Sequence, residues 1–502
     1  MPAVAQTSST APSAMRVWPW LLLAALVVAG RGAIFVWRGP LAFDGDQALV
    51  GIMAKHISEG RAFPVFQYAL PYILIVSAWV SVPFFWVMGP TIAALKVPVL
   101  LLNVALGVWL VRAIAHVGVR PAFAFAIALP LLAVAPITAS GLMDALGMTI
   151  EPLVFVALLW GTRRSPVLFG VVAGVGFLVR EFVAYGVAAV WLVDMVDGRG
   201  RTPAGVRHWA LVLLASLGTK ASVDALNRFG SAAGPGTWFP EDGGGNLTAL
   251  SSAFCFEPQQ AATNVLALGQ WYVGLLLGAV PARVSDGAVQ TAVRQGAVWL
   301  WPLLGVALLV MIVTTGWRWR ALWAMRRNPG VHLAIFLAAV GAQSLIVYAI
   351  SRCSLVSVLT VRYALLGIFV PSGVVLAWWL VEPRRWLRVA GIGTLVLSAC
   401  VNLVAHAALW REQVTAPPPA NRADLARELE RRGVFLARSD YWTAYYVSFI
   451  SQERVIVSST GFARVDEYER RIALASEPVP TILMEPCGDE PPIVPGFWLC
   501  PP

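Results

Sequence analysis

The chain has 502 residues, of which 58% are hydrophobic and only 13% are charged, and its mean hydropathy is +0.71. This apolar content exceeds that of water-soluble globular proteins and of disordered chains, so the sequence predicts a polytopic membrane protein. The net charge is +10. In a membrane protein such basic residues usually report orientation, so we expect no nucleic acid partner.

Eleven apolar stretches are predicted to form transmembrane helices. In chain order they cover residues 19–37, 92–111, 121–139, 149–160, 166–179, 182–195, 209–225, 297–314, 331–350, 363–381 and 389–409. They lack the alternation of a membrane β-barrel, so we expect an all-α fold in the membrane. The first 15 residues read as a short polar leader without a cleavage signature, so the first helix is expected to be a retained signal anchor.

Arginine residues cluster in every second connection between these stretches, and the positive-inside rule places such connections in the cytoplasm. The clusters are Arg112 with Arg120, Arg163 with Arg164, Arg199 with Arg201 and Arg207, Arg318 with Arg320, Arg326 and Arg327, and Arg384 with Arg385 and Arg388. The other connections are then expected outside, namely residues 38–91, 140–148, 180–181, 226–296 and 351–362, together with everything after 410.

Residues 70–88 are also apolar enough to cross, but a crossing here would move the first arginine cluster to the outside. We therefore expect this segment to form a juxtamembrane or re-entrant helix in the outer interface. An amphipathic helix at 47–59 is predicted to precede it. An ordinary transmembrane hairpin with residues 92–111 is the alternative.

Composition changes near the C-terminal end, where three consecutive prolines occupy positions 417–419. They mark a linker at 411–420 between a membrane domain, residues 1–410, and a small external α/β domain, residues 421–502. Within the latter, helices are predicted at 421–432 and 441–451 and strands at 434–437, 454–458 and 481–484.

Five cysteines are divided by this topology. Cys400 lies in the last predicted helix, and the other four are expected outside, where disulfides can form. Cys487 and Cys500 close a short proline-rich loop and are the predicted pair, with unpaired thiols as the alternative. None of the spacings is typical of a metal site.

Two carboxylates, Asp44 and Asp46, flank Gly45 directly after the first predicted helix. Carboxylates beside an apolar domain cost free energy, which suggests a function for them. Around a flexible glycine they can converge on one hydroxyl or on one divalent cation, such as Mg²⁺ or Mn²⁺. Capping of the following helix by Asp46 is the purely structural alternative.

The sequence from Asp44 to Tyr68, DGDQALVGIMAKHISEGRAFPVFQY, resembles the first extracytoplasmic loop of bacterial membrane glycosyltransferases with the GT-C fold. These are related to protein O-mannosyltransferases (glycosyltransferase family 39) and lipid A aminoarabinose transferases. The resemblance continues more faintly at Arg362-Tyr363 and in YWTAYYVSFISQERVIV, residues 441–457. It implies that Asp46 is the general base toward the acceptor, that Asp44 orients it or shares a cation, and that Tyr68 and Tyr363 line the substrate site.

The chain departs from this pattern at Ser77, where the related proteins carry a glutamate in the apolar stretch. Asp144 and Glu151, in the second external connection, could supply the missing carboxylate. As alternatives, Asp144 is a solvated loop residue and Glu151 is a partner of the helix dipole.

Arg180 and Glu181 join two predicted helices of about 14 residues, which are short for a complete crossing. Their tip is therefore expected inside the protein, where the two side chains face a polar cavity or neutralise each other. Lys96, Arg352 and Arg362 are further cations at the outer face and could bind a phosphate, arginine in a bidentate manner. Snorkelling toward water is the alternative, and is favoured for Lys96 and Arg352.

An external active site has no supply of nucleotide sugars, whereas the bilayer itself delivers polyprenyl-phosphate sugars. We therefore expect a plasma-membrane transferase that moves a sugar from a polyprenyl-phosphate donor to a lipid, glycan or protein hydroxyl, with the inversion that the resemblance implies. The alternative is a transporter or flippase of a polar lipid, which would carry charged residues near the bilayer midplane in two related halves.

Overall fold

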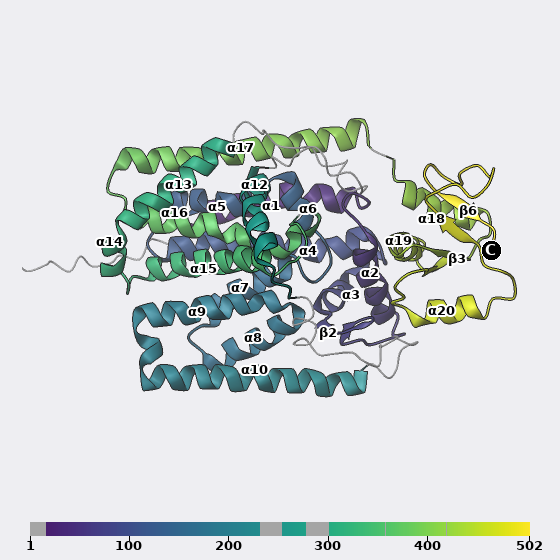
Figure 1. Cartoon of the computed structure of the whole chain (residues 1–502), viewed down its shortest axis with the longest axis horizontal. Coiled ribbons are helices and arrows are strands. Elements are labelled where there is room, and N and C mark those ends of the chain that lie inside the picture. The colour runs from purple at the N-terminus through teal and green to yellow at the C-terminus, as the bar shows by residue number, and fades with distance from the viewer. Residues whose placement is uncertain (1–16, 231–253, 278–300, 357, 418) are drawn as a thin grey trace, which may run out of the picture.

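The computed structural model describes residues 17–230, 254–277, 301–356, 358–417 and 419–502. The predicted leader and much of the 226–296 connection lie outside these ranges. In the described part, long helices form a membrane domain, and a small α/β domain packs against one end of it (Figure 1). Helix α14 (Trp319–Ala324), in one of the arginine clusters, lies at the opposite end (Figure 1).

Each of the eleven predicted stretches contains a helix, and the chain is a multi-pass membrane protein. In chain order the membrane domain comprises α1 (Trp18–Trp37), α4 (Ile92–His116), α5 (Pro121–Leu132), α6 (Pro136–Leu142), α7 (Ile150–Thr162), α8 (Pro166–Val179), η2 (Glu181–Val183), α9 (Ala184–Asp197), η3 (Arg199–Arg201), α10 (Pro203–Gly230), α13 (Trp301–Trp317), α14, α15 (Pro329–Ile350), η6 (Val358–Ile368), α16 (Phe369–Val381) and α17 (Arg385–Thr415). An additional helix, α12 (Pro258–Leu277), lies in the 226–296 connection.

Helix length separates these elements into two groups. Among the described helices, six are long and apolar enough to cross a membrane alone, namely α1, α4, α10, α15, α17 and the stretch Arg362–Val381 that ends in α16. The pair α5 and α6 would be a seventh as one broken span, with a bend of 82°. Pro136 begins α6 and has no N–H for the helical hydrogen-bond ladder, which accounts for the break. The other predicted stretches hold shorter helices. The structure therefore agrees with the predicted positions of the helices, but not with eleven helices that each cross the membrane alone.

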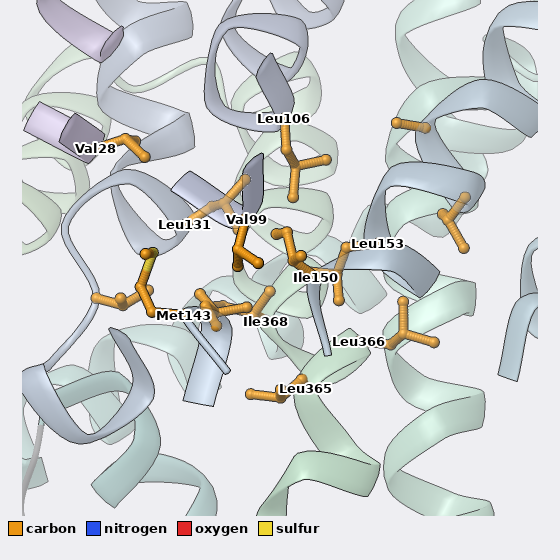
Figure 2. Close-up of a cluster of buried hydrophobic side chains, with 14 of the residues drawn as sticks. Val28, Val99, Leu106, Leu131, Met143, Ile150, Leu153, Leu365, Leu366 and Ile368 are labelled. Atoms are coloured by element: carbon orange, nitrogen blue, oxygen red, sulfur yellow. The ribbon is translucent and has the colours of Figure 1, made fainter. Parts of the chain in front are cut away.

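The core of the membrane domain is closely packed. Buried side chains from several helices meet there, including Val28, Val99, Leu106, Leu131, Ile150, Leu153 and Leu366 (Figure 2). Small residues let the backbones approach: a Cβ on Gly170 would lie 2.5 Å from the Val212 carbonyl oxygen, and one on Gly373 would lie 2.5 Å from the Ala338 nitrogen. Such contacts hold helices together in lipid, where the hydrophobic effect between helices is absent.

The first long connection folds differently from the prediction. It contains α2 (Gly45–Ser58), a hairpin of β1 (Phe66–Gln67) and β2 (Leu70–Leu74), and α3 (Val76–Met88). Residues 70–88 are therefore a strand and a helix of 13 residues, about 20 Å long. The amphipathic character predicted for α2 is wrong, because twelve of its 14 residues are buried. The C-terminal domain covers the face that the sequence assigned to solvent.

The C-terminal domain is a small α/β unit. Its sheet has the order β4-β3-β5-β6, with β5 and β6 antiparallel and the other pairs parallel. The elements are α18 (Asn421–Arg431), β3 (Leu436–Ser439), α19 (Tyr441–Ile450), β4 (Ile456–Ser459), α20 (Asp466–Ala473), β5 (Thr481–Leu483) and β6 (Trp498–Cys500). The predicted helices and strands are present, β3 and β4 each begin two residues later than predicted, and α20 and β6 are additions.

Two disulfides tie down connections at this end of the protein. Cys487 pairs with Cys500, the last residue of β6, and Cys255 pairs with Cys353. The second bridge joins the segment before α12 to the segment before η6. Cys400 is the free thiol of the chain.

Candidate active site

The two aspartates after α1 have different partners at the start of α2. Asp44 is the N-cap residue, and its Oδ1 accepts a hydrogen bond of 3.0 Å from the Gln47 backbone N–H. The cap that we considered for Asp46 is therefore made by Asp44. Asp46 lies in the first turn, where a carboxylate also interacts favourably with the helix dipole.

Asp46 connects three distant parts of the chain. Its Oδ1 accepts a hydrogen bond of 2.8 Å from the hydroxyl of Tyr441, at the start of α19. Its Oδ2 lies 3.4 Å from Nη1 of Arg362, in η6. The carboxylate is therefore held between the membrane domain and the C-terminal domain, with a cation on one side and a phenol on the other.

Gln47 joins the first loop to the connection after α6. Its Nε2 donates to the Ala42 carbonyl at 3.0 Å and to Oδ1 of Asp144 at 3.3 Å. Its Oε1 accepts from the Ala145 backbone N–H at 3.1 Å. The solvated position considered for Asp144 is therefore wrong, because this amide draws the side chain into the protein.

Burial and mutual repulsion raise the pKa values of two neighbouring carboxyls. Burial raises the pKa of Asp44, and the Asp46 carboxylate raises it further. Burial likewise raises the pKa of Asp144 well above its usual range, with Asp44 as the next cause. Both carboxyls hold a proton more readily than in water, while Asp46 has a cation beside it.

Lys96 binds the backbone of the loop that precedes α2. The side chain is fully buried in α4, and its Nζ donates to the carbonyl oxygens of Leu41 at 3.2 Å and Ala42 at 2.9 Å. The snorkelling conformation favoured for Lys96 is wrong, since the ammonium points into the protein. Lys96 fixes the backbone that leads into Asp44.

The cations near η6 are grouped around Tyr363. The guanidinium carbons of Arg352 and Arg362 lie 4.7 and 5.4 Å from the centre of its ring. Phe182 meets the same ring edge-on at 5.9 Å. Arg352 thus stacks on aromatic rings, and Arg362 is the one that reaches Asp46.

Arg180 and Glu181 pair with each other at 3.6 Å, and both are mostly buried. Nη2 of Arg180 also lies 2.9 Å from the Met148 sulfur, which places the pair beside the connection that carries Asp144. Glu151 is buried and accepts a hydrogen bond of 3.3 Å from the Thr149 backbone N–H at the start of α7. These partners are local, and none of the three contacts Asp46.

The side chains do not fit the divalent-cation site suggested for Asp44 and Asp46. Asp44 is occupied as a helix cap, and both oxygens of Asp46 face donors, Tyr441 and Arg362. In the described ranges, no three His, Cys, Asp or Glu side chains are grouped so that they could hold a metal ion. The arrangement instead suits acid–base chemistry beside a bound anion.

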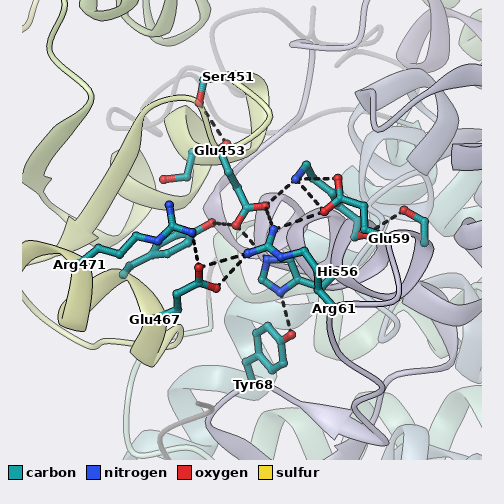
Figure 3. Close-up of polar contacts among 12 residues, drawn as sticks. His56, Glu59, Arg61, Tyr68, Ser451, Glu453, Glu467 and Arg471 are labelled. Atoms are coloured by element: carbon teal, nitrogen blue, oxygen red, sulfur yellow. Dashed lines mark hydrogen bonds and ion pairs between the residues drawn. The ribbon is translucent and has the colours of Figure 1, made fainter. Parts of the chain in front are cut away.

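A second polar cluster joins the first loop to the C-terminal domain at the far end of α2 (Figure 3). Its centre is Glu453, whose buried carboxylate lies 2.7 Å from Lys55, 2.8 Å from His56 and 2.8 Å from Arg61. The Tyr468 hydroxyl donates to the same carboxylate at 3.0 Å. Arg61 also pairs with Glu467 at 2.9 Å, and His56 is 2.9 Å from the Tyr68 hydroxyl. Tyr68 thus belongs to this interdomain cluster, away from Asp46.

These contacts could be predicted from the sequence only in part. Tyr441 and Glu453 belong to the stretch 441–457 that carries the fainter resemblance, but no local pattern relates them to α2. Arg464 was missed altogether. Its Nη1 donates to the Tyr68 carbonyl at 3.4 Å, and its guanidinium carbon lies 5.8 Å from the Tyr441 ring.

The interdomain cluster makes stability depend on pH. Burial alone would raise the pKa of Glu453, but hydrogen bonds and charge from His56 and Lys55 outweigh burial and hold the pKa well below its usual range. Because the folded pKa is below the unfolded one, the carboxylate stabilises the fold above the ordinary glutamate pKa of about 4.3. This stabilisation is lost as the pH falls toward the folded pKa.

Glu453→Gln should therefore lower the unfolding free energy by about 3 kcal/mol at neutral pH, because it removes the buried carboxylate that Lys55, His56 and Arg61 share. The measurement is thermal unfolding in detergent, and the gap to the wild type should narrow below about pH 4. Glu430→Gln is the matched control, since Glu430 pairs with Arg454 on the surface of the same domain. Equal, small effects of both substitutions would contradict the role of Glu453.

Comparisons with known proteins identify the fold. No protein-family model matches the sequence, and no curated protein matches it. ArnT from Cupriavidus metallidurans, in its crystal structure bound to undecaprenyl phosphate, is similar with a TM-score of 0.53 and 13% identity, over 92% of this chain and 93% of its own. The Archaeoglobus fulgidus oligosaccharyltransferase, in complex with Zn and sulfate, gives a TM-score of 0.52 and 13% identity, over 89% of this chain and 62% of its own.

The oligosaccharyltransferase AglB from Archaeoglobus fulgidus, in complex with an inhibitory peptide and a dolichol-phosphate, gives a TM-score of 0.50 and 11% identity, over 89% of this chain and 64% of its own. ArnT and AglB are both membrane glycosyltransferases with the GT-C fold. At such low identity the likeness concerns the fold, and it extends over nearly the whole chain. The protein described here therefore has the GT-C fold of membrane glycosyltransferases.

Proposed function

We propose that the protein is an inverting glycosyltransferase that moves a sugar from a polyprenyl-phosphate donor to a hydroxyl acceptor, with Asp46 as the general base. The observation that carries this proposal is the pairing of Asp46 with Arg362 at 3.4 Å. A base that must remove a proton thus lies beside a guanidinium that can bind a phosphate. The two residues come from different elements and meet at the end of the membrane domain that carries α2.

The reaction is a single displacement. Asp46 takes the proton of the acceptor hydroxyl, and the oxygen of that hydroxyl attacks the anomeric carbon. At the same time the bond from the anomeric carbon to the donor phosphate oxygen breaks. The electron pair leaves with the phosphate, whose charge Arg362 stabilises with its fork of donors. Attack opposite the leaving group inverts the anomeric carbon. General base catalysis of this kind contributes about 10² to 10⁴-fold.

A lipid-linked donor is supported by the fold and by the position of the site. The ArnT structure contains undecaprenyl phosphate and the AglB structure contains a dolichol-phosphate. In this chain Arg362 begins the apolar stretch Arg362–Val381, which is long and apolar enough to cross a membrane, so we expect its guanidinium at a membrane boundary. A phosphate on a polyprenyl chain would reach it from the bilayer.

The active site is proposed to face the extracytoplasmic side of the plasma membrane. Helix α14, which arginines of one cluster flank, lies at the end of the molecule opposite to the C-terminal domain (Figure 1), as the positive-inside rule requires. Both disulfides are in connections assigned to the outside, and disulfides persist in oxidising compartments.

Cysteine labelling in intact cells tests this orientation. In a Cys400→Ser background, with both disulfides kept, Ser476→Cys should react with a membrane-impermeant thiol reagent. Ser165→Cys and Thr202→Cys should react only after the cells are opened. All three positions are exposed, so access to the reagent depends on the side of the membrane. The reverse pattern would place the active site in the cytoplasm and remove the case for an externally used donor.

A transporter or flippase of a polar lipid is the second candidate, and one observation favours it. Arg31 of α1 is buried inside the membrane domain, and its Nη2 donates to the Asn103 side chain of α4 at 3.2 Å. Buried charges of this kind are common along transport pathways.

A proteoliposome assay separates the two candidates. The vesicles receive a panel of undecaprenyl-phosphate-linked hexoses and pentoses, with an extract of the host envelope as the acceptor source. A transferase converts one of these donors to free undecaprenyl phosphate, whereas a transporter moves the intact glycolipid between leaflets. Movement of an intact glycolipid without release of undecaprenyl phosphate would overturn the proposed function.

A further inference from the structure

Helices α2 and α19 lie side by side and are joined at both ends, although they belong to different domains (Figure 1). At the first ends, the Tyr441 hydroxyl donates to Asp46 at 2.8 Å. Near the other ends, Glu453 pairs with Lys55 and His56. The two helices therefore run in the same direction, with a polar contact near each end.

The two helices leave no free space between them at Gly45 and at Gly51 of α2. A Cβ on Gly45 would lie 2.9 Å from the Trp442 Cα, and a Cβ on Gly51 would lie 2.5 Å from the Phe449 ring. Phe43, just before α2, packs edge-on against the Tyr446 ring at 5.4 Å. The separation and register of the two helices are therefore fixed, and with them the position of Tyr441 relative to Asp46.

Tyr441 can act only as a donor in this contact. Burial raises the pKa of its phenol, and the Asp46 carboxylate raises it further, so the hydroxyl keeps its proton at neutral pH. The charged groups around Asp46 are Arg362 from η6, and Asp44 and Asp144 from the neighbouring loops, while Arg464 faces the ring of Tyr441. The contact of the Tyr441 hydroxyl with the Asp46 carboxylate, at 2.8 Å, is shorter than that of Arg362, at 3.4 Å.

We infer that Tyr441 is a positioning residue that orients the Asp46 carboxylate, so that the C-terminal domain completes the active site. The inference rests on the proposed role of Asp46 as the base. A hydrogen bond to one carboxylate oxygen favours the ionised form and fixes its rotamer. The other oxygen then faces Arg362, on the side where the donor phosphate is proposed to bind.

Tyr441→Phe removes this hydroxyl and keeps the ring. Turnover of the undecaprenyl-phosphate sugar found in the donor panel should fall about tenfold. The acid limb of the pH–rate profile should move up by about one pH unit, because the ionised carboxylate has lost a donor. The thermal midpoint should stay near that of the wild type. Tyr446→Phe is the matched control, because Tyr446 is buried on the same helix and makes no contact with Asp46, so its rate and profile should be unchanged.

A measurement without substrate keeps the inference testable. The carboxyl band that Asp46→Asn removes from the infrared spectrum is titrated in wild type, Tyr441→Phe and Tyr446→Phe. The titration should move to higher pH by about one unit in Tyr441→Phe alone. An unchanged titration and pH–rate profile in Tyr441→Phe would overturn the inference and leave the proposed function intact. A fully active Asp46→Asn protein would instead overturn the proposed function. The infrared titration would still show whether Tyr441 acts on the Asp46 carboxylate.

Discussion

Asp46→Asn should lower the turnover of the sugar donor at least about 100-fold. The amide has the shape of the carboxylate and can still accept a hydrogen bond from Tyr441, but it cannot take the acceptor proton. The fold should remain intact, because Asp44, and not Asp46, caps α2. The measurement is release of undecaprenyl phosphate from the donor by the purified protein in proteoliposomes, together with its thermal midpoint.

The control for this substitution is Asp424→Asn on α18. Asp424 forms an exposed ion pair with Arg427, far along the chain from α2, so wild-type turnover is expected. Wild-type turnover in Asp46→Asn would end the assignment of Asp46 as the base. A loss of turnover accompanied by unfolding would mean that Asp46 has a structural role in joining the two domains.

Arg362 should show the second large effect, and its replacements should differ from each other. Arg362→Ala removes the charge beside Asp46 and should reduce kcat/KM by about 10² to 10³-fold, as the loss of a donor to a developing anion does elsewhere. Arg362→Lys keeps the charge but loses the planar fork, so we expect a loss of about tenfold. Rates of undecaprenyl phosphate release at several donor concentrations measure both.

Arg352→Ala is the matched control for Arg362. Arg352 stacks on the same Tyr363 ring at 4.7 Å but has no ion pair with Asp46, so a mild effect is expected. If Arg362→Ala and Arg362→Lys had equal and mild effects, Arg362 would be an anchor at the membrane boundary. The donor phosphate would then need another partner.

Helix positions in the membrane domain could be predicted from the sequence because apolar runs are a local property. The close contact of α8 with α10 is not local, since it depends on a helix more than 40 residues further along the chain. The first loop shows most clearly what a local sequence pattern cannot predict. The period of α2 indicated one exposed face, but that face is covered by α19, almost 400 residues later.

The candidate site was predictable in part for the same reason. Asp44, Asp46 and Arg362 were found because charged residues beside apolar stretches are conspicuous. Their partners were not, because Tyr441 lies 395 residues from Asp46 and no short pattern relates the two. Lys96 was misread because a lysine near a helix end usually reaches water, and only the tertiary structure brings two carbonyl oxygens to its ammonium.

The central claim is that the protein consumes a polyprenyl-phosphate sugar through Asp46, and mass spectrometry of lipid extracts tests it most directly. Extracts are compared from the parent strain, a deletion strain, and the deletion strain carrying either the wild-type or the Asp46→Asn gene at equal protein level. One polyprenyl-phosphate glycoside should accumulate in the deletion strain, stay raised with Asp46→Asn and return to the parental level with the wild type. Unchanged polyprenyl-phosphate glycosides in the deletion strain, or full restoration by Asp46→Asn, would contradict the claim.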